Sequence, residues 1–172
     1  MKIFLIGFMG SGKTTIGRDL AELLGFDFVD TDRFIEMLYH TTVAQIFTQK
    51  GEAAFREMEY GVLQELIGRE RAVVATGGGM PCYSANMELM LASGKVAYLK
   101  THPQTLAGRL QYSHAERPLI KGKTETELRQ YIVEKLIERE PYYLRAHIIV
   151  QTDNISMETL LQTLHRQLVI RR

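Results

Sequence analysis

The sequence has one cysteine, no tryptophan and only four prolines in 172 residues. A single cysteine, Cys82, excludes an internal disulfide and fits a reducing compartment. Basic and acidic side chains nearly cancel, 21 against 20, which leaves a net charge of +1. This balance argues against a nucleic-acid partner held by a strong basic field. No apolar run approaches the roughly 20 residues that span a bilayer, so we expect no membrane partner and a cytoplasmic protein.

The chain opens on an apolar run, "KIFLIGF", which raises the question of a signal peptide. The run is short, and it leads into a glycine-rich loop without a small-residue cleavage pattern. A buried β-strand bounded by glycine is the better interpretation.

Short apolar runs alternate with amphipathic segments along the whole chain. Strands are expected at 3–8, 26–30, 95–100 and 147–152, and in the segment 71–79, where a strand that ends at Ala75 and Thr76 runs into a glycine turn. Helices are expected at 14–25, 33–40, 42–51, 52–68, 84–93, 103–110, 124–146 and 156–169. Alternation of this kind predicts one α/β domain over 1–172, with a five-stranded, mostly parallel sheet between two helical layers. Ligands of such sheets bind at the carboxyl ends of the strands.

The segment "GFMGSGKT", residues 7–14, matches G-x-x-x-x-G-K-S/T at every fixed position, follows an expected strand and opens an expected helix. Glycines let successive N–H groups point at an anion, and the helix N-terminus adds partial positive charge. Lys13 would reach the β- and γ-phosphates, and the Thr14 hydroxyl would ligate Mg²⁺. The motif predicts a P-loop NTPase fold with ATP and Mg²⁺. The expected nucleotide contacts in the loop are Gly10, Ser11, Gly12, Lys13, Thr14 and Thr15.

Two aspartates, Asp30 and Asp32, follow the second expected strand, beside the phosphate loop. Two residues apart on an extended segment, their side chains point the same way. One could hold the water shell of Mg²⁺ while the other contacts an acceptor hydroxyl. The alternative is that Asp32 only caps the helix that follows.

Three arginines have contexts that suit anion binding. Arg117 lies in the one long irregular segment, 111–123, where a lid over phosphates is expected. Arg139 stands near a helix end, where a cation also complements the helix dipole. Arg56 precedes Glu57 and Glu59, so pairing along the helix could explain it fully.

A second glycine turn, "TGGGMP" at 76–81, follows the third expected strand and invites backbone N–H contacts with a polar ligand. The alternative is a tight turn that needs positive φ. That strand ends in Ala75 and Thr76 rather than in the aspartate of a Walker-B strand, which departs from motor ATPases and GTPases.

Taken together, the sequence resembles the shikimate kinases of the nucleoside monophosphate kinase-like group. The pieces that carry the resemblance are "GFMGSGKTTIG", "FVDTDRFIE", "IFTQKGEAAFREME", "VVATGGGMP", "RPLI" and "REPYYLRA", in the family's order and approximate spacing. They cover nearly the whole chain. The first is common to many P-loop proteins, whereas the combination is specific.

The resemblance implies ATP-dependent phosphorylation of the 3-hydroxyl of shikimate, with 31–60 as the substrate-binding segment and 111–123 as the lid. It implies a catalytic set of Lys13, Asp32 and Arg117. It implies shikimate contacts from Asp32, Phe47, Phe55, Arg56, Gly78, Gly79 and Arg139. Thr14 would ligate Mg²⁺ with Asp30 acting through water, and Arg109 and Asp153 would lie near adenine.

Two positions depart from the family pattern. Arg145 stands where a glutamate is usual, and His147 where an aspartate is frequent, which puts local ion pairing in doubt. Two other functions stay open: another small-molecule P-loop kinase such as a gluconate kinase, and a catalytically silent nucleotide-binding module. The small size permits a monomer.

Overall fold

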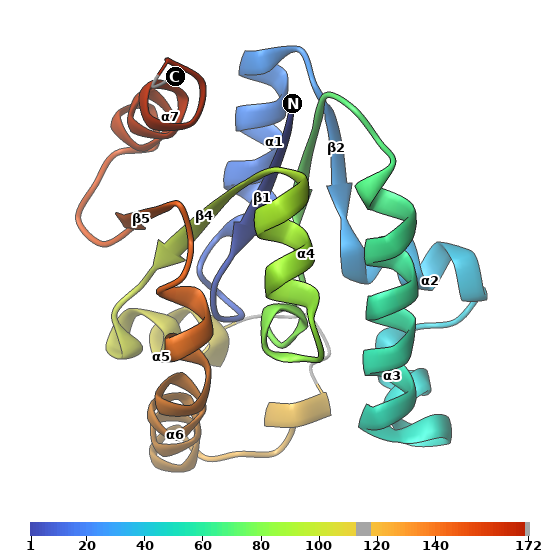
Figure 1. Ribbon diagram of the computed structural model, residues 1–172. Helices are drawn as coiled ribbons and strands as arrows, with labels where there is room; N and C mark the ends of the chain where they lie inside the picture. The colour runs from blue at the N-terminus through green and yellow to red at the C-terminus, as the bar shows by residue number, and fades with distance from the viewer. Residues whose placement is uncertain (113–117, 171–172) are drawn as a thin grey trace.

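The computed structural model describes residues 1–112 and 118–170. These residues contain five strands in one sheet, and each neighbouring pair is parallel, as predicted. The strands are β1 (Lys2–Ile6), β2 (Asp27–Asp30), β3 (Ala72–Ala75), β4 (Lys95–Lys100) and β5 (Ile148–Gln151). Their spatial order is β2-β3-β1-β4-β5 (Figure 1).

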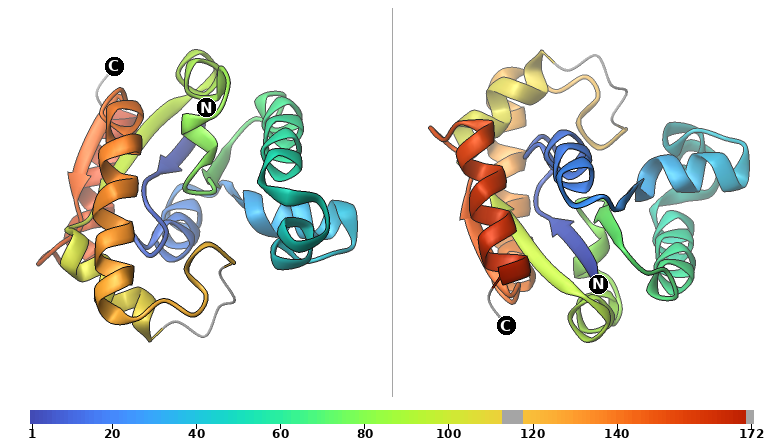
Figure 2. Two further views of the ribbon diagram at one scale, coloured as in Figure 1. Left: turned by 90° about the horizontal axis from the view of Figure 1, so that it is seen from below. Right: turned by 90° about the horizontal axis from the view of Figure 1, so that it is seen from above.

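Helices cover both faces of the sheet, which gives the expected three layers. Figure 2 shows α1 and α4 on opposite faces. The helices are α1 (Lys13–Leu24), α2 (Thr31–Tyr39), α3 (Val43–Ile67), α4 (Asn86–Ser93), α5 (Pro103–Gln111), α6 (Glu125–Tyr143) and α7 (Met157–His165). Two short 3₁₀ helices, η1 (Met80–Cys82) and η2 (Pro118–Ile120), and a π-helical turn (Arg166–Ile170) complete the described elements.

The central strand β1 shows why the sheet needs cover on both sides. Ile3 and Leu5 are fully buried with side chains of α1 and α7, whereas Phe4 and Ile6 are fully buried with side chains of α3 and α4. Successive residues of a strand point to opposite faces, so a continuous apolar run reports burial on both. None of the helices in the described part of the chain combines the length and apolar character that a membrane crossing requires.

Element boundaries differ from the sequence prediction in one informative place. The two helices expected at 42–51 and 52–68 form the single element α3, which is interrupted at Gly51 by a non-helical backbone with φ 81° and ψ 173°. Glycine adopts positive φ without the penalty of a Cβ atom, so the chain turns there and continues as helix. The short first part carries Phe47, and the long second part carries Phe55 and Arg56.

Capping residues set several helix starts as expected. Thr124 and Glu127 form a capping box at the start of α6, and the Ser156 side chain caps α7. Of the expected lid, 111–123, the structure describes Gln111, Tyr112 and residues from 118 onward, where η2 lies. The predicted phosphate contact Arg117 lies outside the described residues.

Candidate active site

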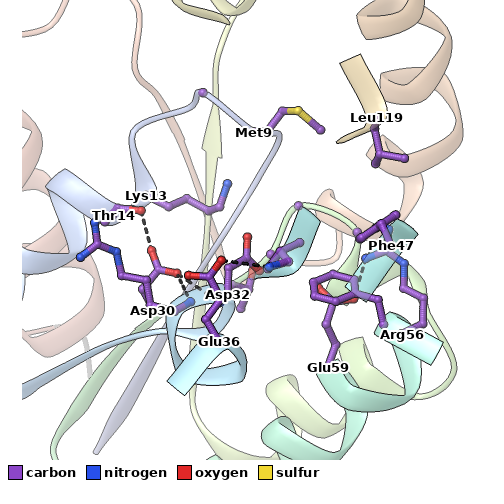
Figure 3. A pocket seen from close by; sticks show the side chains of 18 of the residues that line it. Met9, Lys13, Thr14, Asp30, Asp32, Glu36, Phe47, Arg56, Glu59 and Leu119 are labelled. Carbon is purple, nitrogen blue, oxygen red and sulfur yellow. Dashed lines mark hydrogen bonds and ion pairs between the residues drawn. The ribbon is translucent and has the colours of Figure 1, made fainter. Parts of the chain in front are cut away.

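An open pocket of about 440 Å³ lies at the carboxyl ends of β1, β2 and β3 (Figure 3). The phosphate loop, the start of α2, α3, the second glycine turn and α6 all contribute to its wall. Residues that line it include Gly10, Gly12, Lys13, Thr14, Thr15, Asp30, Asp32, Phe47, Phe55, Arg56, Gly78, Gly79 and Arg139. The structure therefore brings together in one cavity most of the site residues that the sequence predicted.

The phosphate loop has the backbone conformation that its glycines predict. Gly10 and Gly12 have φ of 83° and 95°, a region that favours glycine. Helix α1 starts at Lys13, and no side chain caps its first N–H groups. Uncapped N–H groups at a helix start are donors for an anion.

The Lys13 side chain is 8% exposed and lines the pocket. Its ammonium donates to the carbonyl oxygens of Gly7 and Phe8, both at 2.9 Å. These two bonds hold the charge over the loop, where phosphate oxygens would be recognised.

The predicted metal pair, Thr14 and Asp30, is in direct contact. The Thr14 hydroxyl donates to Asp30 Oδ2 at 2.7 Å. In the described part of the chain, no three His, Cys, Asp or Glu side chains are grouped to hold a metal ion. Mg²⁺ takes hard oxygen ligands and keeps several waters, with one or two protein ligands beside substrate phosphates. One hydroxyl and one carboxylate beside a phosphate loop fit that requirement.

The two aspartates do not lie on one extended segment, because α2 already begins at Thr31. The other Asp30 oxygen, Oδ1, accepts from the backbone N–H groups of Asp32 and Arg33 at 3.2 and 3.3 Å, so Asp30 is the helix cap. The alternative that Asp32 caps the helix is therefore wrong. Its carboxylate lines the pocket from the first turn of α2.

The Arg56 guanidinium is held in place by two carboxylates of its own helix. Nη1 donates to Glu59 at 2.5 Å, and Nη2 donates to Glu52 at 2.7 Å. The alternative that Arg56 pairs along its helix therefore holds for Glu59, whereas Glu57 takes no part and instead accepts from the Tyr83 hydroxyl. Arg56 is 8% exposed and lines the pocket. The ion pairs therefore hold its guanidinium at the pocket wall and do not exclude a role in ligand binding.

Glu59 is the main site residue that sequence reasoning did not select. It is fully buried and lines the pocket. Burial, with a smaller contribution from the nearby Asp32 charge, raises its pKa to about 7 against the lowering effect of Arg56 and Arg139. A signal was present in the sequence. Glu59 stands among the buried helix positions Phe55, Val62 and Leu66, where a carboxylate is anomalous.

The pKa of Glu59 predicts a pH effect on stability. A carboxyl group whose pKa is raised on folding stabilises the folded state at pH values below about 4.5, its ordinary pKa. This contribution to the free energy of unfolding is lost as the pH rises to about 7. We therefore expect the free energy of unfolding of the wild type, relative to Glu59→Gln, to fall as the pH rises through this range. Urea unfolding of both proteins at several pH values measures the difference. A difference that does not change with pH contradicts the raised pKa.

Arg139 comes from α6 and is 7% exposed. Its guanidinium lies 5.4 Å from the Phe8 ring centroid, which fixes it by a cation–π contact. Its Nη1 is buried with no hydrogen-bond acceptor among the described residues, and no carboxylate of that part of the chain lies within ion-pair distance of it. A buried unsatisfied donor on a cation is costly, so this group is set to receive an anionic ligand.

The alternative for the second glycine turn, that its glycines are needed for positive φ, is wrong. Gly77, Gly78 and Gly79 are all absent from the positive-φ positions. A Cβ atom on Gly77 would lie 2.3 Å from Glu59 Oε1 and 2.8 Å from Asp32 Oδ1, and one on Gly79 would lie 2.4 Å from Arg56 Nη2. Gly77 and Gly79 are therefore needed because a side chain at either position would clash with the charged side chains packed against the turn.

Gly79→Ala is therefore expected to push the Arg56 guanidinium out of place. We expect weaker binding of any anion held by that guanidinium and a loss of stability of about 1–3 kcal/mol from overpacking. The matched control is Gly61→Ala in α3, where an added Cβ meets no atom within 4 Å. That control should be neutral or stabilising. Thermal unfolding and substrate KM measure both, and equal behaviour of the two variants contradicts the steric argument.

Apolar side chains form the rest of the wall. The rings of Phe47 and Phe55 pack at a centroid distance of 4.9 Å, as neighbours across Gly51. Leu119 of η2 and Met9 of the phosphate loop face them across the cavity (Figure 3). A wall of this kind suits the faces of a small ring.

The predicted adenine contacts lie in a neighbouring cleft beside α5 and the end of β5. Arg109 donates to the Gly10 carbonyl at 3.0 Å, which joins this cleft to the phosphate loop. Asp153 lines the same cleft and accepts from the backbone N–H of His102 at 2.8 Å. The two predicted residues thus line one cleft, and Arg109 contacts the loop.

The two departures from the family pattern both have local partners. Arg145 pairs with Glu88 of α4 at 2.8 Å. His147 Nδ1 accepts from the backbone N–H of Val96 at 3.0 Å, and burial lowers the pKa of this histidine. Neither residue lines the pocket, so both are peripheral to it.

The cavity combines a phosphate loop, the oxygen ligands Thr14 and Asp30 for a cation, and two buried arginines. This combination is typical of small-molecule kinases of the P-loop type. The model of the shikimate kinase family matches residues 9–169. The chain belongs to the shikimate kinase family.

Relatives and solved structures agree with this assignment. The chain is 45% identical over 158 residues to the shikimate kinase of Parabacteroides distasonis, covering 92% of this chain and 91% of that relative. A crystal structure of the Bacteroides thetaiotaomicron shikimate kinase matches with a TM-score of 0.91 at 40% identity, over 96% of this chain and 97% of the other. The Acinetobacter baumannii enzyme in complex with shikimate matches with a TM-score of 0.92 at 37% identity, over 99% and 94%.

The gluconate kinase alternative has much weaker support. A gluconokinase from Sinorhizobium meliloti matches with a TM-score of 0.59 at 17% identity, which shows a shared fold alone.

Proposed function

We propose that this protein transfers the γ-phosphoryl group of ATP to the 3-hydroxyl of shikimate. The observation that carries the proposal is the position of Arg56 and Arg139, two buried guanidinium groups at one end of a cavity whose other end is a phosphate loop. Guanidinium binds carboxylate through paired N–H donors, which suits an acid substrate. The complex of the Acinetobacter baumannii relative with shikimate supports the choice of acid.

Binding would fix the acid in one orientation. Its carboxylate would lie between Arg56 and Arg139, with the Arg139 donor that has no acceptor among the described residues taking one oxygen. Its ring would lie between the side chains of Phe47 and Leu119. Backbone groups of Gly78 and Gly79 would contact its hydroxyls. Holding both reactants in line converts a bimolecular step into a unimolecular one, which supplies much of the rate.

In the transfer step, the acceptor oxygen forms a bond to the γ-phosphorus while the bond from that phosphorus to the β–γ bridging oxygen breaks, and ADP leaves. Asp32 would orient the hydroxyl and accept its proton. Lys13 and the N–H groups of the loop would stabilise negative charge on the phosphates. Thr14 and Asp30 would hold Mg²⁺, which supplies charge neutralisation between the β- and γ-phosphates.

The remaining expectations belong to the same proposal. Residues 31–60 would serve as the substrate-binding segment and 111–123 as a lid that contributes Arg117 to the phosphates. Arg109 and Asp153 would contact adenine. We propose that the protein works as a monomer in the cytoplasm.

The test is ADP release from Mg-ATP by the purified chain, offered shikimate, gluconate, a nucleoside monophosphate or no acceptor. Release that depends on shikimate alone is the expected result. Release with another acceptor would keep the kinase activity and overturn the substrate. A folded chain that binds ATP but releases no ADP with any acceptor would support the silent-module alternative.

A further inference from the structure

A second cavity of about 390 Å³ lies beside the active site, on the other side of the two arginines. Arg56, Gly79, Leu119 and Arg139 line both cavities, so the arginine pair forms a shared wall. The other residues that line this open cavity come mainly from α3, η1 and α6, and Figure 2 shows α3 and α6 on opposite sides of this end of the molecule. Nothing in the proposed reaction uses this space.

The lining of the second cavity has the chemistry of an anion site. Its cations are Arg56, Arg139 and Lys135, against the carboxylates of Glu52 and Glu138. Lys135 pairs with Glu138 at 2.6 Å at the exposed rim. At the inner end, Arg56 is paired with Glu52 and Glu59, whereas the buried Nη1 of Arg139 has no hydrogen-bond acceptor among the described residues.

One hydroxyl in this cavity is buried and unsatisfied. The Tyr131 Oη atom has no hydrogen-bond partner in the described part of the chain, although tyrosine hydroxyls that lose contact with water usually find one. The charges that act most strongly on this hydroxyl come from Arg139, Lys135, Glu52 and Arg56. Tyr131 therefore offers a donor directed at the same region as the three cations.

We propose that this second cavity is a binding site for a small ring-bearing carboxylate. The carboxylate would accept from the Tyr131 hydroxyl and lie close to Arg139 and Lys135, and its ring would pack among Tyr131, Tyr142 and Leu119. Arg56 and Arg139 line both cavities. An acid bound in the second cavity would therefore compete with the substrate carboxylate for these two guanidinium groups. This last consequence rests on the proposed function, whereas the site itself does not.

Cys82 lines the second cavity and is the sole cysteine, so it reports on the site without any assay of activity. Iodoacetate and iodoacetamide both alkylate thiolates with loss of iodide, but only the first carries a carboxylate. We compare their rates at Cys82, by intact mass at pH 9, with their rates on the neutral thiol N-acetylcysteinamide. Alkaline conditions are needed because burial raises the pKa of this thiol to about 11.

A carboxylate site predicts that the iodoacetate to iodoacetamide ratio at Cys82 exceeds that of the small thiol by about tenfold, the effect of about 1.4 kcal/mol. Tyr131→Phe and Lys135→Met should each lower this ratio several-fold. Arg129→Met removes a cation of the same helix from an exposed pair with Glu125, and it should leave the ratio unchanged. A ratio equal to that of the small thiol, or one that is the same in all variants, overturns the site.

Calorimetric titration with 4-hydroxybenzoate gives an independent readout. The expected result is binding by the wild type that weakens in Tyr131→Phe and Lys135→Met but not in Arg129→Met. If the compound binds all four proteins equally, it occupies only the first cavity and the inference is wrong. Chains that fail to release ADP with shikimate would refute the proposed function, but the alkylation ratios would still decide this site.

Discussion

Asp32→Asn is expected to lower kcat with shikimate by about 10²- to 10⁴-fold, the usual range for loss of a group that takes or directs a proton. Asparagine keeps the size of the side chain and a carbonyl oxygen, so the pocket keeps its shape. It cannot accept a proton at neutral pH. Nucleotide binding should be unchanged, because Lys13 and the loop N–H groups lie outside the substituted turn. Steady-state ADP release gives kcat, and calorimetry gives the affinity for ATP.

The matched control is Asp27→Asn, at the exposed start of β2, the strand that precedes α2. It should leave both kcat and nucleotide affinity at wild-type values. Normal turnover by Asp32→Asn would remove this carboxylate from the reaction. A joint loss of turnover and ATP affinity would instead show that the substitution disturbs the phosphate loop through the neighbouring cap Asp30.

Arg139→Ala is expected to raise the KM for shikimate by about 30- to 5,000-fold, with a smaller effect on kcat. Removal of one partner of a buried charge pair costs about 2–5 kcal/mol of binding. The KM for ATP should stay near its wild-type value, since Arg139 stands at the acid end of the pocket. Initial rates with each substrate varied in turn separate the two constants.

Arg145→Ala provides the control for Arg139→Ala. It removes a guanidinium from just after the same helix, and its pair with Glu88 is exposed, so solvent screening leaves that pair a small effect. Neither KM should change. Arg139→Lys should fall between the wild type and alanine, because an ammonium keeps the charge but not the paired donors. A lysine variant with wild-type KM would mean that charge alone binds the acid.

Most of the fold could be predicted from the sequence because its signals are local and agree with one another. Apolar runs that end in glycine or aspartate mark strands that lie between two helical layers, and Thr124 and Ser156 mark helix starts by their own hydrogen bonds. The phosphate loop combines a motif with its expected strand and helix. These features depend on residues close in the sequence, so no knowledge of distant contacts is needed.

Features that depend on distant contacts could not be predicted in the same way. Spacing alone does not tell whether Asp30 or Asp32 caps α2, because either can reach the first N–H groups. A glycine is needed at position 79 because the guanidinium of Arg56, 23 positions earlier in the sequence, packs against it. Only the folded structure shows that these two residues are in contact. The sequence offers pairing between Arg56 and Glu59 as an alternative to a site role, but both side chains are buried at the pocket wall, and spacing along a helix does not show that.

Arg56 and Arg139 come from two helices that contact the same short turn, η1. Both guanidinium groups are buried, and Glu59, which feels the charge of both, has a pKa near neutrality. An acid seated between them acts as a counter-ion that joins α3 to α6. Its binding adds to the free energy of unfolding by mass action, about 2.7 kcal/mol at 100 times its Kd. The melting temperature of this protein therefore follows the concentration of its acid, and the chain opens most readily to proteases when that acid is scarce.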